Sequence, residues 1–390
     1  MVVTADAVII GGGVMGCSIL YNLAVRGLKD VLLLERDVLG SGSTGRSSSI
    51  IRMHYSNEVH ARLAWQSLEI FRNFEQIVGG ACGFVQTGYL VLVGEDEVEA
   101  FQGNIAMQQR VGIQTGSISH QEAQEIAPGF YLDDCAAIAY EPLSGYADAS
   151  GTTYAYATRA RQLGARIWLQ TPATGVEVAG WRVLAVNTAH ERIETPVAIV
   201  ATGPWSRRFL GQHDIELPLE ATRHEVVILK RPIDQLPYHP GGADLSHMVY
   251  WRPESADLTL VGNGNIEEVI EDPEIYAPRA SPGFIQEVWG RLARRIPAMA
   301  EAQFSAGYAG LYTTTPDAHP VIDRVEGIEG FYICTGFSGH GFKLSPMVGV
   351  LTAELVLDGQ ATTIDISPLR MSRFREGKLN QPSYGFRVLV

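Results

Sequence analysis

The sequence of 390 residues has few cysteines and a deficit of positive charge. Its four cysteines, Cys17, Cys82, Cys135 and Cys334, stand far apart and form no C-x-x-C pair. We therefore expect neither a metal cluster nor a disulfide framework, and a reducing, cytoplasmic location suits the chain. The net charge of −13 disfavours nucleic acid and anionic membrane surfaces as partners, because both are negatively charged.

Long uncharged runs are equally scarce. Residues 7–25 carry no charge and are just long enough to span a bilayer. However, the run contains Gly11-Gly12-Gly13 and lacks the basic flank of a signal peptide. A strand, a glycine turn and a helix explain the same residues better, so we expect no transmembrane segment.

The length and the order of the patterns predict two interleaved domains, because one core rarely organises 390 residues. A βα rhythm at the start, in the middle and at the end of the chain predicts an α/β, Rossmann-like domain. Its expected segments are 1–84, 144–214 and 306–390. The strand-rich sequence between them predicts a sheet-rich substrate domain of residues 85–143 and 215–305.

Helix boundaries are marked by capping residues. Asn57 is placed to cap a helix of residues 58–78, and Ser119 and Glu122 form a capping box. Near the C-terminus, Ser345 followed by Pro346 predicts the start of the last helix.

A glycine motif lies between the first strand and the first helix. Gly11, Gly13 and Gly16 have the spacing that lets a backbone turn tightly, approach a pyrophosphate and pack helix on strand. Val14 and Met15 open the helix, whose N-terminus favours phosphate. Glu35 ends the second strand, where an acid can accept hydrogen bonds from ribose hydroxyls. With its neighbour Arg36, it completes the expected dinucleotide site. A merely tight turn is the alternative.

Small and hydroxyl side chains follow the acid and let the backbone lie close to a ligand. The candidates there are Ser43, Thr44, Arg46, Ser47 and Ser48. On composition alone, a flexible glycine-serine loop would explain them too.

Two later segments favour FAD over NAD. The first ends a buried strand with a sharp turn and supplies Ala201, Thr202, Gly203 and Trp205. The second leads into the last helix and supplies Gly336, Ser338, Gly339, His340, Gly341, Phe342 and Lys343. A second helix N-terminus stabilises negative charge on a reduced flavin. Val176 and Gly310 are further cofactor candidates.

With these motifs the chain resembles the glycine oxidase, sarcosine oxidase and D-amino-acid oxidase family of FAD oxidoreductases. The likeness covers nearly the whole chain and is strongest over residues 6–55 and 310–359. Leu311-Tyr312-Thr313-Thr314-Thr315-Pro316-Asp317 looks like the turn before the final flavin loop. Thr44-Gly45-Arg46-Ser47 followed by Ile50-Ile51-Arg52 looks closest to sarcosine oxidases and their dehydrogenase relatives.

The resemblance implies oxidation of a small amino acid or amine, sarcosine-like N-alkyl glycines first, by hydride transfer to FAD. The resulting imine would then hydrolyse. By motif match, Arg52 and Lys343 would hold the substrate carboxylate and so fix the substrate at the flavin. Taken singly, each could be a surface cation.

The sequence departs from the family pattern in three places. Gly310 stands where monomeric sarcosine oxidase attaches its flavin to a cysteine, so we expect non-covalent FAD. The histidine that attaches a second flavin is missing near residues 148–149, so no FMN is expected. Residues 259–263 carry no cation where the oxygen-activating lysine is expected, so a dehydrogenase that passes electrons to another acceptor is an alternative to an oxidase that uses oxygen.

Weaker candidates for the substrate pocket are Tyr312, His224 and Tyr250, although a strand histidine such as His224 is more commonly a packed core residue. His340 is expected near the flavin rather than as a base. A D-amino-acid, proline or opine dehydrogenase subunit remains open, as does a homo- or hetero-oligomer. Two further alternatives are disfavoured. A flavin-binding electron carrier without its own substrate would not need Arg52 and Lys343, and an NAD-only dehydrogenase would not need the C-terminal flavin loop.

Overall fold

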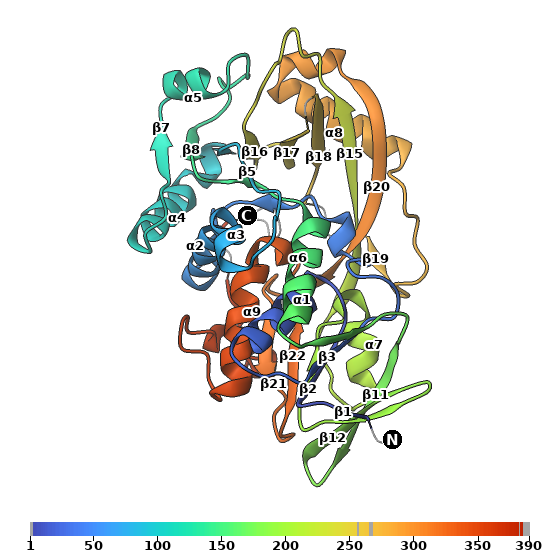
Figure 1. Cartoon of the computed structure of the whole chain (residues 1–390). Helices are drawn as coiled ribbons and strands as arrows, with labels where there is room; N and C mark the ends of the chain where they lie inside the picture. Colours follow the sequence, from blue (N-terminus) through green and yellow to red (C-terminus); the bar gives the residue numbers. More distant parts are fainter. Residues whose placement is uncertain (1–2, 256, 265–267, 382, 385–390) are drawn as a thin grey trace.

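The computed structural model describes residues 3–255, 257–264, 268–381 and 383–384. A six-stranded sheet occupies the lower part of the molecule in Figure 1. Its strands, in spatial order, are β10 (Arg166–Trp168), β3 (Val31–Leu34), β2 (Ala7–Ile10), β14 (Ala198–Val200), β22 (Phe331–Thr335) and β21 (Val321–Arg324). All neighbours pair in parallel except β21 and β22. Both faces of this sheet are covered, which explains why β2 and β3 are buried at every position.

Helices form the layer on one face of the sheet. They are α1 (Val14–Val25), α2 (Glu58–Arg72), α3 (Phe74–Ile77), α6 (Ala149–Gln162) and α9 (Gly341–Leu357), and their apolar sides share one core. The other face packs on α7 (Ser206–Gly211) and on a four-stranded sheet. That sheet contains β1 (Val3–Thr4), β13 (Arg192–Glu194), β12 (Arg182–Thr188) and β11 (Ala173–Ala179). This is the doubly covered α/β arrangement that the βα rhythm predicted.

A nine-stranded sheet forms the upper part of Figure 1. Its strands are β6 (Tyr89–Val93), β7 (Gly116–Ile118), β8 (Ala137–Glu141), β15 (Glu220–Lys230), β16 (Gly241–Asp244), β17 (Val249–Glu254), β18 (Leu258–Gly262), β19 (Val269–Ile270) and β20 (Gln303–Thr314). The helices of this region are α4 (Val98–Arg110), α5 (His120–Ile126) and α8 (Pro282–Arg295). A small third sheet consists of β4 (Ile50–Ile51), β9 (Gly145–Tyr146) and β5 (Val85–Gln86), and its strands come between strands of the two large sheets in the sequence. The predicted boundary at residue 306 falls inside β20, which pairs with β15 along its whole length. Residues 1–2 and 385–390 of the predicted first domain lie outside the described residues.

The last helix begins earlier than its sequence indicates. The prediction that Ser345 caps it is wrong, because α9 starts at Gly341 with His340 as its N-cap and contains Pro346. Ser67 on α2 supports the helix around this proline: its hydroxyl accepts a hydrogen bond from Met347 N (3.3 Å) and donates to the Leu344 carbonyl (3.4 Å). These tertiary contacts hold the helix on both sides of Pro346, which cannot donate an intrahelical hydrogen bond of its own.

The long helix predicted for residues 58–78 is interrupted. Asn57 caps α2 by accepting a hydrogen bond from His60 N, and α2 ends at Arg72 before the short α3. The capping box of Ser119 and Glu122 is present as predicted.

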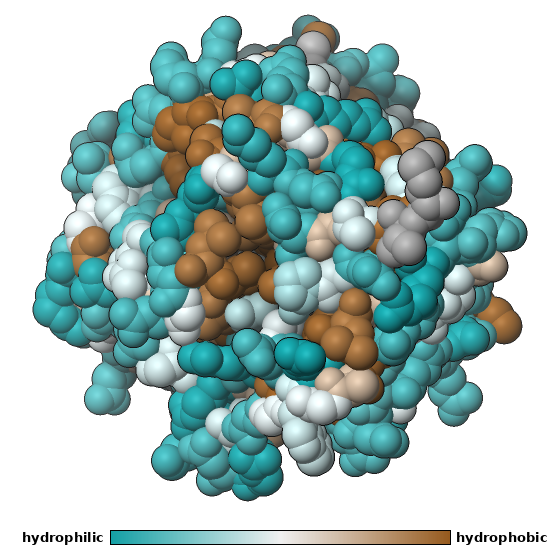
Figure 2. Space-filling view, turned by 60° about the horizontal axis from the view of Figure 1, so that its bottom comes forward, coloured by the Kyte–Doolittle hydropathy of each residue, from teal (hydrophilic) through white to brown (hydrophobic). Residues whose placement is uncertain are grey.

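The surface in Figure 2 is mostly hydrophilic, with hydrophobic residues gathered near the middle of the face. Residues 7–25 form β2 and α1 rather than one span. Among the residues that the structure describes, no helix combines the length and apolar character needed to cross a membrane.

Candidate active site

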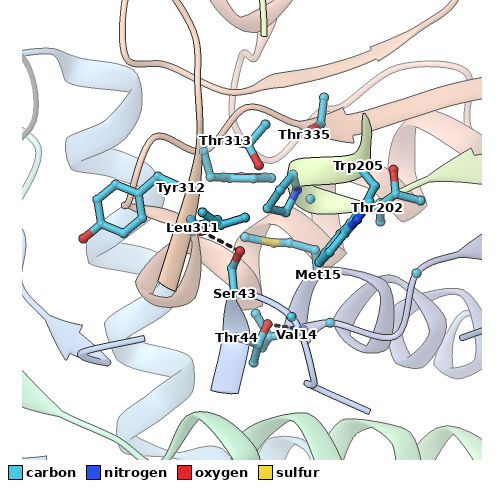
Figure 3. Close-up of a pocket in the computed structure, with 18 of the residues that line it drawn as sticks. Val14, Met15, Ser43, Thr44, Thr202, Trp205, Leu311, Tyr312, Thr313 and Thr335 are labelled. Atoms are coloured by element: carbon cyan, nitrogen blue, oxygen red, sulfur yellow. Dashed lines mark hydrogen bonds between the residues drawn. The ribbon is translucent and has the colours of Figure 1, made fainter. Parts of the chain in front are cut away.

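A cavity of about 610 Å³ runs from the glycine turn after β2 to the far end of β20. Figure 3 shows Thr202 and Trp205 at one end and Tyr312 at the other, with Met15 and Ser43 between them. Most predicted cofactor residues line this cavity: Gly11, Gly13, Val14, Met15, Glu35, Arg36, Ser43, Thr44, Arg46, Ser47, Ser48, Ala201, Thr202, Gly203, Trp205, Gly310, Gly336, Ser338, Gly339, Gly341 and Phe342. His224, Tyr250 and Tyr312 line it as well. The cofactor residues in this list come from six separate sequence segments, which the fold brings to one elongated space.

The glycine turn leaves room for phosphate at the start of α1. Gly11 has φ +115°, and a Cβ there would lie 2.4 Å from the Ala201 carbonyl oxygen. A Cβ on Gly16 would lie 1.9 Å from the Gly11 carbonyl oxygen, so this glycine lets α1 pack on the turn. The Thr44 hydroxyl accepts a hydrogen bond from Val14 N (3.1 Å), which ties the small-residue loop to the helix start (Figure 3). A glycine turn that leads into a helix N-terminus lets the backbone come close to a pyrophosphate.

Glu35 is fixed by backbone groups at the end of β3. Its carboxylate accepts hydrogen bonds from Gly12 N (2.6 Å) and Asp37 N (2.8 Å). A carboxylate has lone pairs beyond these two, and Glu35 lines the cavity, so it can accept further bonds from ribose hydroxyls. The turn, the acid and the length of the cavity together fit the expected FAD.

Four predicted cofactor residues do not line the cavity. Gly16 packs under the glycine turn. Val176 lies just behind the cavity wall that residues 172–174 form, and its N–H donates to His213 Nε2 (3.2 Å). His340 is the N-cap of α9, and Lys343 lies in its first turn. Each directly follows a residue that lines the cavity. Among the described residues, no group of three or more histidine, cysteine or acidic side chains is arranged to hold a metal ion.

Two aromatic rings stack at the far end of the cavity. The rings of His224 and Tyr312 lie 3.5 Å apart at 18°. His224 Nε2 pairs with the Thr222 hydroxyl (3.0 Å), and burial lowers the pKa of His224 to about 3, so the ring is neutral at pH 7. Its Nδ1 has no partner among the residues described. The far end is thus aromatic and uncharged.

Tyr250 lies beside residues 259–263, the segment that carries no cation. A Cβ on Gly262 of β18 would lie 2.4 Å from the Tyr250 hydroxyl, and the two residues are paired across β17 and β18. Gly262 therefore makes room for Tyr250, whose buried hydroxyl interacts with Tyr312 and Ser48.

Arg52 and Lys343 are buried close to each other, although neither lines the cavity. Arg52 follows β4, Lys343 lies in the first turn of α9, and they are 5% and 7% exposed. The Arg52 guanidinium lies over the Tyr55 ring (5.0 Å) and donates to the His54 carbonyl. Burial and the positive charge of Arg52 lower the pKa of Lys343 well below its usual value. Two buried cations with this mutual repulsion form a site suited to an anion.

A buried acid, Glu141, faces these cations and was missed in the sequence. Its carboxylate accepts hydrogen bonds from Met53 N (2.9 Å) and the Ser144 hydroxyl (2.6 Å), so it anchors the segment that carries Arg52. Its other oxygen, Oε1, has no partner among the described residues. Burial raises the pKa of Glu141, while Ser144, Met53, Arg52 and Lys343 oppose that rise. Only an acid at the end of an apolar strand hinted at this role in the sequence.

Three histidines pack beside Lys343, and they too were missed, apart from His340. The His60 and His319 rings meet edge to face at 4.3 Å, and His340 Nδ1 pairs with the Tyr55 hydroxyl (3.1 Å). Burial lowers the pKa of all three, so they add no charge at neutral pH. They surround the cation pair with neutral polar groups.

The comparisons with known proteins agree with this geometry. The model of a family described as "DAO: FAD dependent oxidoreductase" matches residues 6–355. The chain is 28% identical to human peroxisomal sarcosine oxidase, covering 95% of this chain and 96% of that protein. It is 26% identical to human mitochondrial sarcosine dehydrogenase, covering 98% of this chain but 42% of the relative's length. The chain thus spans less than half of that dehydrogenase.

Among solved structures, L-proline dehydrogenase from P. horikoshii matches with a TM-score of 0.89 and 31% identity, covering 97% of this chain and all of that one. Glycine oxidase from Geobacillus kaustophilus, at 22% identity and a TM-score of 0.80, shares the fold.

Proposed function

The chain belongs to the DAO family of FAD-dependent oxidoreductases, and from this premise we propose that it is an amino-acid or amine oxidoreductase that oxidises the C–N bond of a small amino acid. N-alkyl glycines such as sarcosine are the first candidates. The two buried cations carry this proposal. A protein that only carried electrons would have no use for a cation pair next to the flavin loop, whereas the carboxylate of a substrate would be attracted to such a pair.

The clamp places the substrate. Arg52 and Lys343 hold its carboxylate, which aims the carbon that bears the amine at the cavity end lined by Tyr312 and His224. Positioning of this kind supplies much of the rate of a reaction between two bound groups. FAD, when bound, accepts the hydride that this carbon loses.

The neutral surroundings favour an uncharged amine. No described side chain that lines the far end near Tyr312 and His224 carries a negative charge, so an ammonium group gains no partner there. The amine nitrogen thus supplies the electron pair as hydride leaves the carbon, and it becomes an imine nitrogen. Water then adds to the released imine and gives an amine and a carbonyl compound. At this end of the cavity Tyr250 is buried and Tyr312 is half-buried, which limits the access of solvent.

We further propose that the glycine turn, the small-residue loop and the segment before α9 hold FAD without a covalent bond. Gly310 offers no nucleophile, and a Cβ there would lie 2.8 Å from Arg46 Cβ. The position is used to pack Arg46 instead.

A second candidate is a dehydrogenase acting on proline, a D-amino acid or an opine and passing electrons to an acceptor other than oxygen. The likeness to L-proline dehydrogenase supports it, as does the absence of a cation from residues 259–263. Proline and sarcosine are both secondary amines with one carboxylate, so the same clamp serves either.

An anaerobic titration of the yellow protein separates these candidates. Sarcosine, L-proline, D-alanine and an opine are added in turn while the flavin absorption band is followed, and air is then admitted. Bleaching by one amine identifies the substrate, and recovery of colour in air shows that oxygen is an acceptor. Bleaching that persists in air favours the dehydrogenase. No bleaching by any amine would refute the proposal.

A further inference from the structure

One segment of the nine-stranded-sheet region, residues 268–281, reaches the dinucleotide end of the cavity. Near its tip, the Glu274 carboxylate accepts hydrogen bonds from both terminal nitrogens of Arg36, at 3.3 Å for Nη2, and from Trp205 Nε1 (2.7 Å). The Arg36 guanidinium also stacks on the Trp205 ring, 4.0 Å from its centroid. All three side chains line the cavity.

The base of the segment is fixed by Arg223, a buried residue of β15. Arg223 donates to the carbonyl oxygens of Ala277 (2.8 Å) and Arg279 (2.7 Å) and to the Glu268 carboxylate (2.8 Å). At the tip, in contrast, Glu274 makes the contacts with the dinucleotide-binding side. A loop with a fixed base and a polar tip can open at the tip alone.

The contacts of the tip lie where the adenosine half of a dinucleotide is expected. Arg36 directly follows Glu35, the acid at the end of β3, and Trp205 follows β14 on the same edge of the sheet. Trp205 also covers Gly42 of the small-residue loop, since a Cβ on Gly42 would lie 3.3 Å from its ring. The contacts among Arg36, Trp205 and Glu274 therefore join three segments over one end of the cavity.

We propose that Glu274, with Arg36 and Trp205, forms a latch that holds residues 268–281 over the adenosine end of FAD and slows its release. This inference rests on the proposed non-covalent FAD. An exposed ion pair alone contributes little, but here one carboxylate joins a bidentate guanidinium, an indole N–H and a stacked cation–π pair, which act together.

The latch is tested by the rate at which flavin leaves the holoenzyme. Glu274→Gln keeps the shape of the side chain and removes its charge, and Glu271→Gln removes an exposed charge from the same segment as the matched control. We expect FAD to leave Glu274→Gln about tenfold faster than wild type, measured as flavin fluorescence in the filtrate after dilution, with Glu271→Gln unchanged. Adding Arg36→Met to Glu274→Gln should accelerate release little further. Release from Glu274→Gln at the wild-type rate would overturn the latch.

Acid precipitation of the holoenzyme keeps this test separate from the proposal of non-covalent FAD. Flavin in the supernatant supports non-covalent attachment. Flavin in the precipitate refutes that attachment, and chymotrypsin cleavage after Tyr276 then tests the latch on its own. Faster cleavage in Glu274→Gln than in wild type and Glu271→Gln supports it, and equal rates refute it.

Discussion

Each end of the site contains a buried acid, but the two acids are held differently. At the glycine turn, Glu35 accepts hydrogen bonds from two backbone N–H groups. Beside Arg52 and Lys343, one carboxylate oxygen of Glu141 has no partner among the described residues. The turn is also built from neighbours in sequence, while the clamp joins residues 52, 141 and 343. Burial disfavours the charged form of Lys343 and of Glu141 alike. The dinucleotide end is thus complete as a protein structure, whereas at the clamp end an anionic ligand would favour the charged form of Lys343.

This difference has a physical cause. Backbone N–H groups and a helix dipole bind phosphate at no cost in buried charge. A clamp made of side-chain cations must desolvate those cations before the substrate arrives, which costs stability. Mutations at the two ends should therefore affect folding and binding in different proportions.

The largest effect is expected at the turn. Gly16→Ala places a Cβ 1.9 Å from the Gly11 carbonyl oxygen, a contact that only a shift of α1 relieves. We expect the variant to lose about 3 kcal/mol of stability or more, or to fail to fold. Gly13→Ala is the control, because its Cβ would meet only the Thr44 hydroxyl at 3.2 Å. Gly13→Ala should fold and lose flavin affinity instead; thermal unfolding and flavin content distinguish the two, and equal unfolding midpoints would contradict the comparison.

At the clamp, Lys343→Met should separate binding from stability. Removing a buried cation beside Arg52 should raise the unfolding midpoint of the protein without substrate, because an apolar side chain of similar size needs no counter-charge. The same change should weaken substrate binding about 10- to 100-fold, the value of a hydrogen bond to a charged group. Lys29→Met, at an exposed position, should change neither quantity. A lower midpoint together with unchanged binding would place Lys343 in the fold rather than in the clamp.

The pH dependence of carboxylate binding tests the same cation in the unmodified enzyme. The pKa of Lys343 is lowered in the free protein, and a bound carboxylate raises it again because the two charges attract. Binding thus takes up a proton between the two pKa values, so Kd should rise by up to about tenfold per pH unit in that window. Acetate, followed by its perturbation of the flavin spectrum, measures this. A Kd independent of pH in wild type, or the same slope in Lys343→Met, would contradict the assignment.

The smallest effect is expected from Glu141→Gln. The negative charge of Glu141 raises the pKa of Lys343, so its removal should lower that pKa and shift the rise in Kd by up to about one unit toward lower pH. Glutamine can still accept the hydrogen bonds from Met53 N and Ser144, so the segment that carries Arg52 keeps its anchor. Glu301→Gln, at an exposed position, is the control. An unshifted profile in Glu141→Gln would leave this acid a purely structural role.

The residues expected to bind the dinucleotide line one end of the cavity, and most of them are local in the chain. A strand, three glycines, a helix and an acid lie within some thirty residues, and each has a backbone reason to be there. The sequence pattern failed at the start of α9, where Ser345 and Pro346 have the pattern of a helix start but lie inside the helix. The support comes from Ser67 on another helix, which no local rule can see.

Read as a sequence, the chain determined its fold class, the glycine turn and the segments that line the cavity, since these depend on periodicity and backbone geometry over short stretches. Tertiary structure decided the rest. It buried Glu141 beside Arg52 and Lys343, and it brought Glu274 from the sheet-rich region to Arg36 and Trp205. Electrostatic and hydrogen-bonding partners depend on distance in space, and here those partners lie about seventy to three hundred residues apart in the chain.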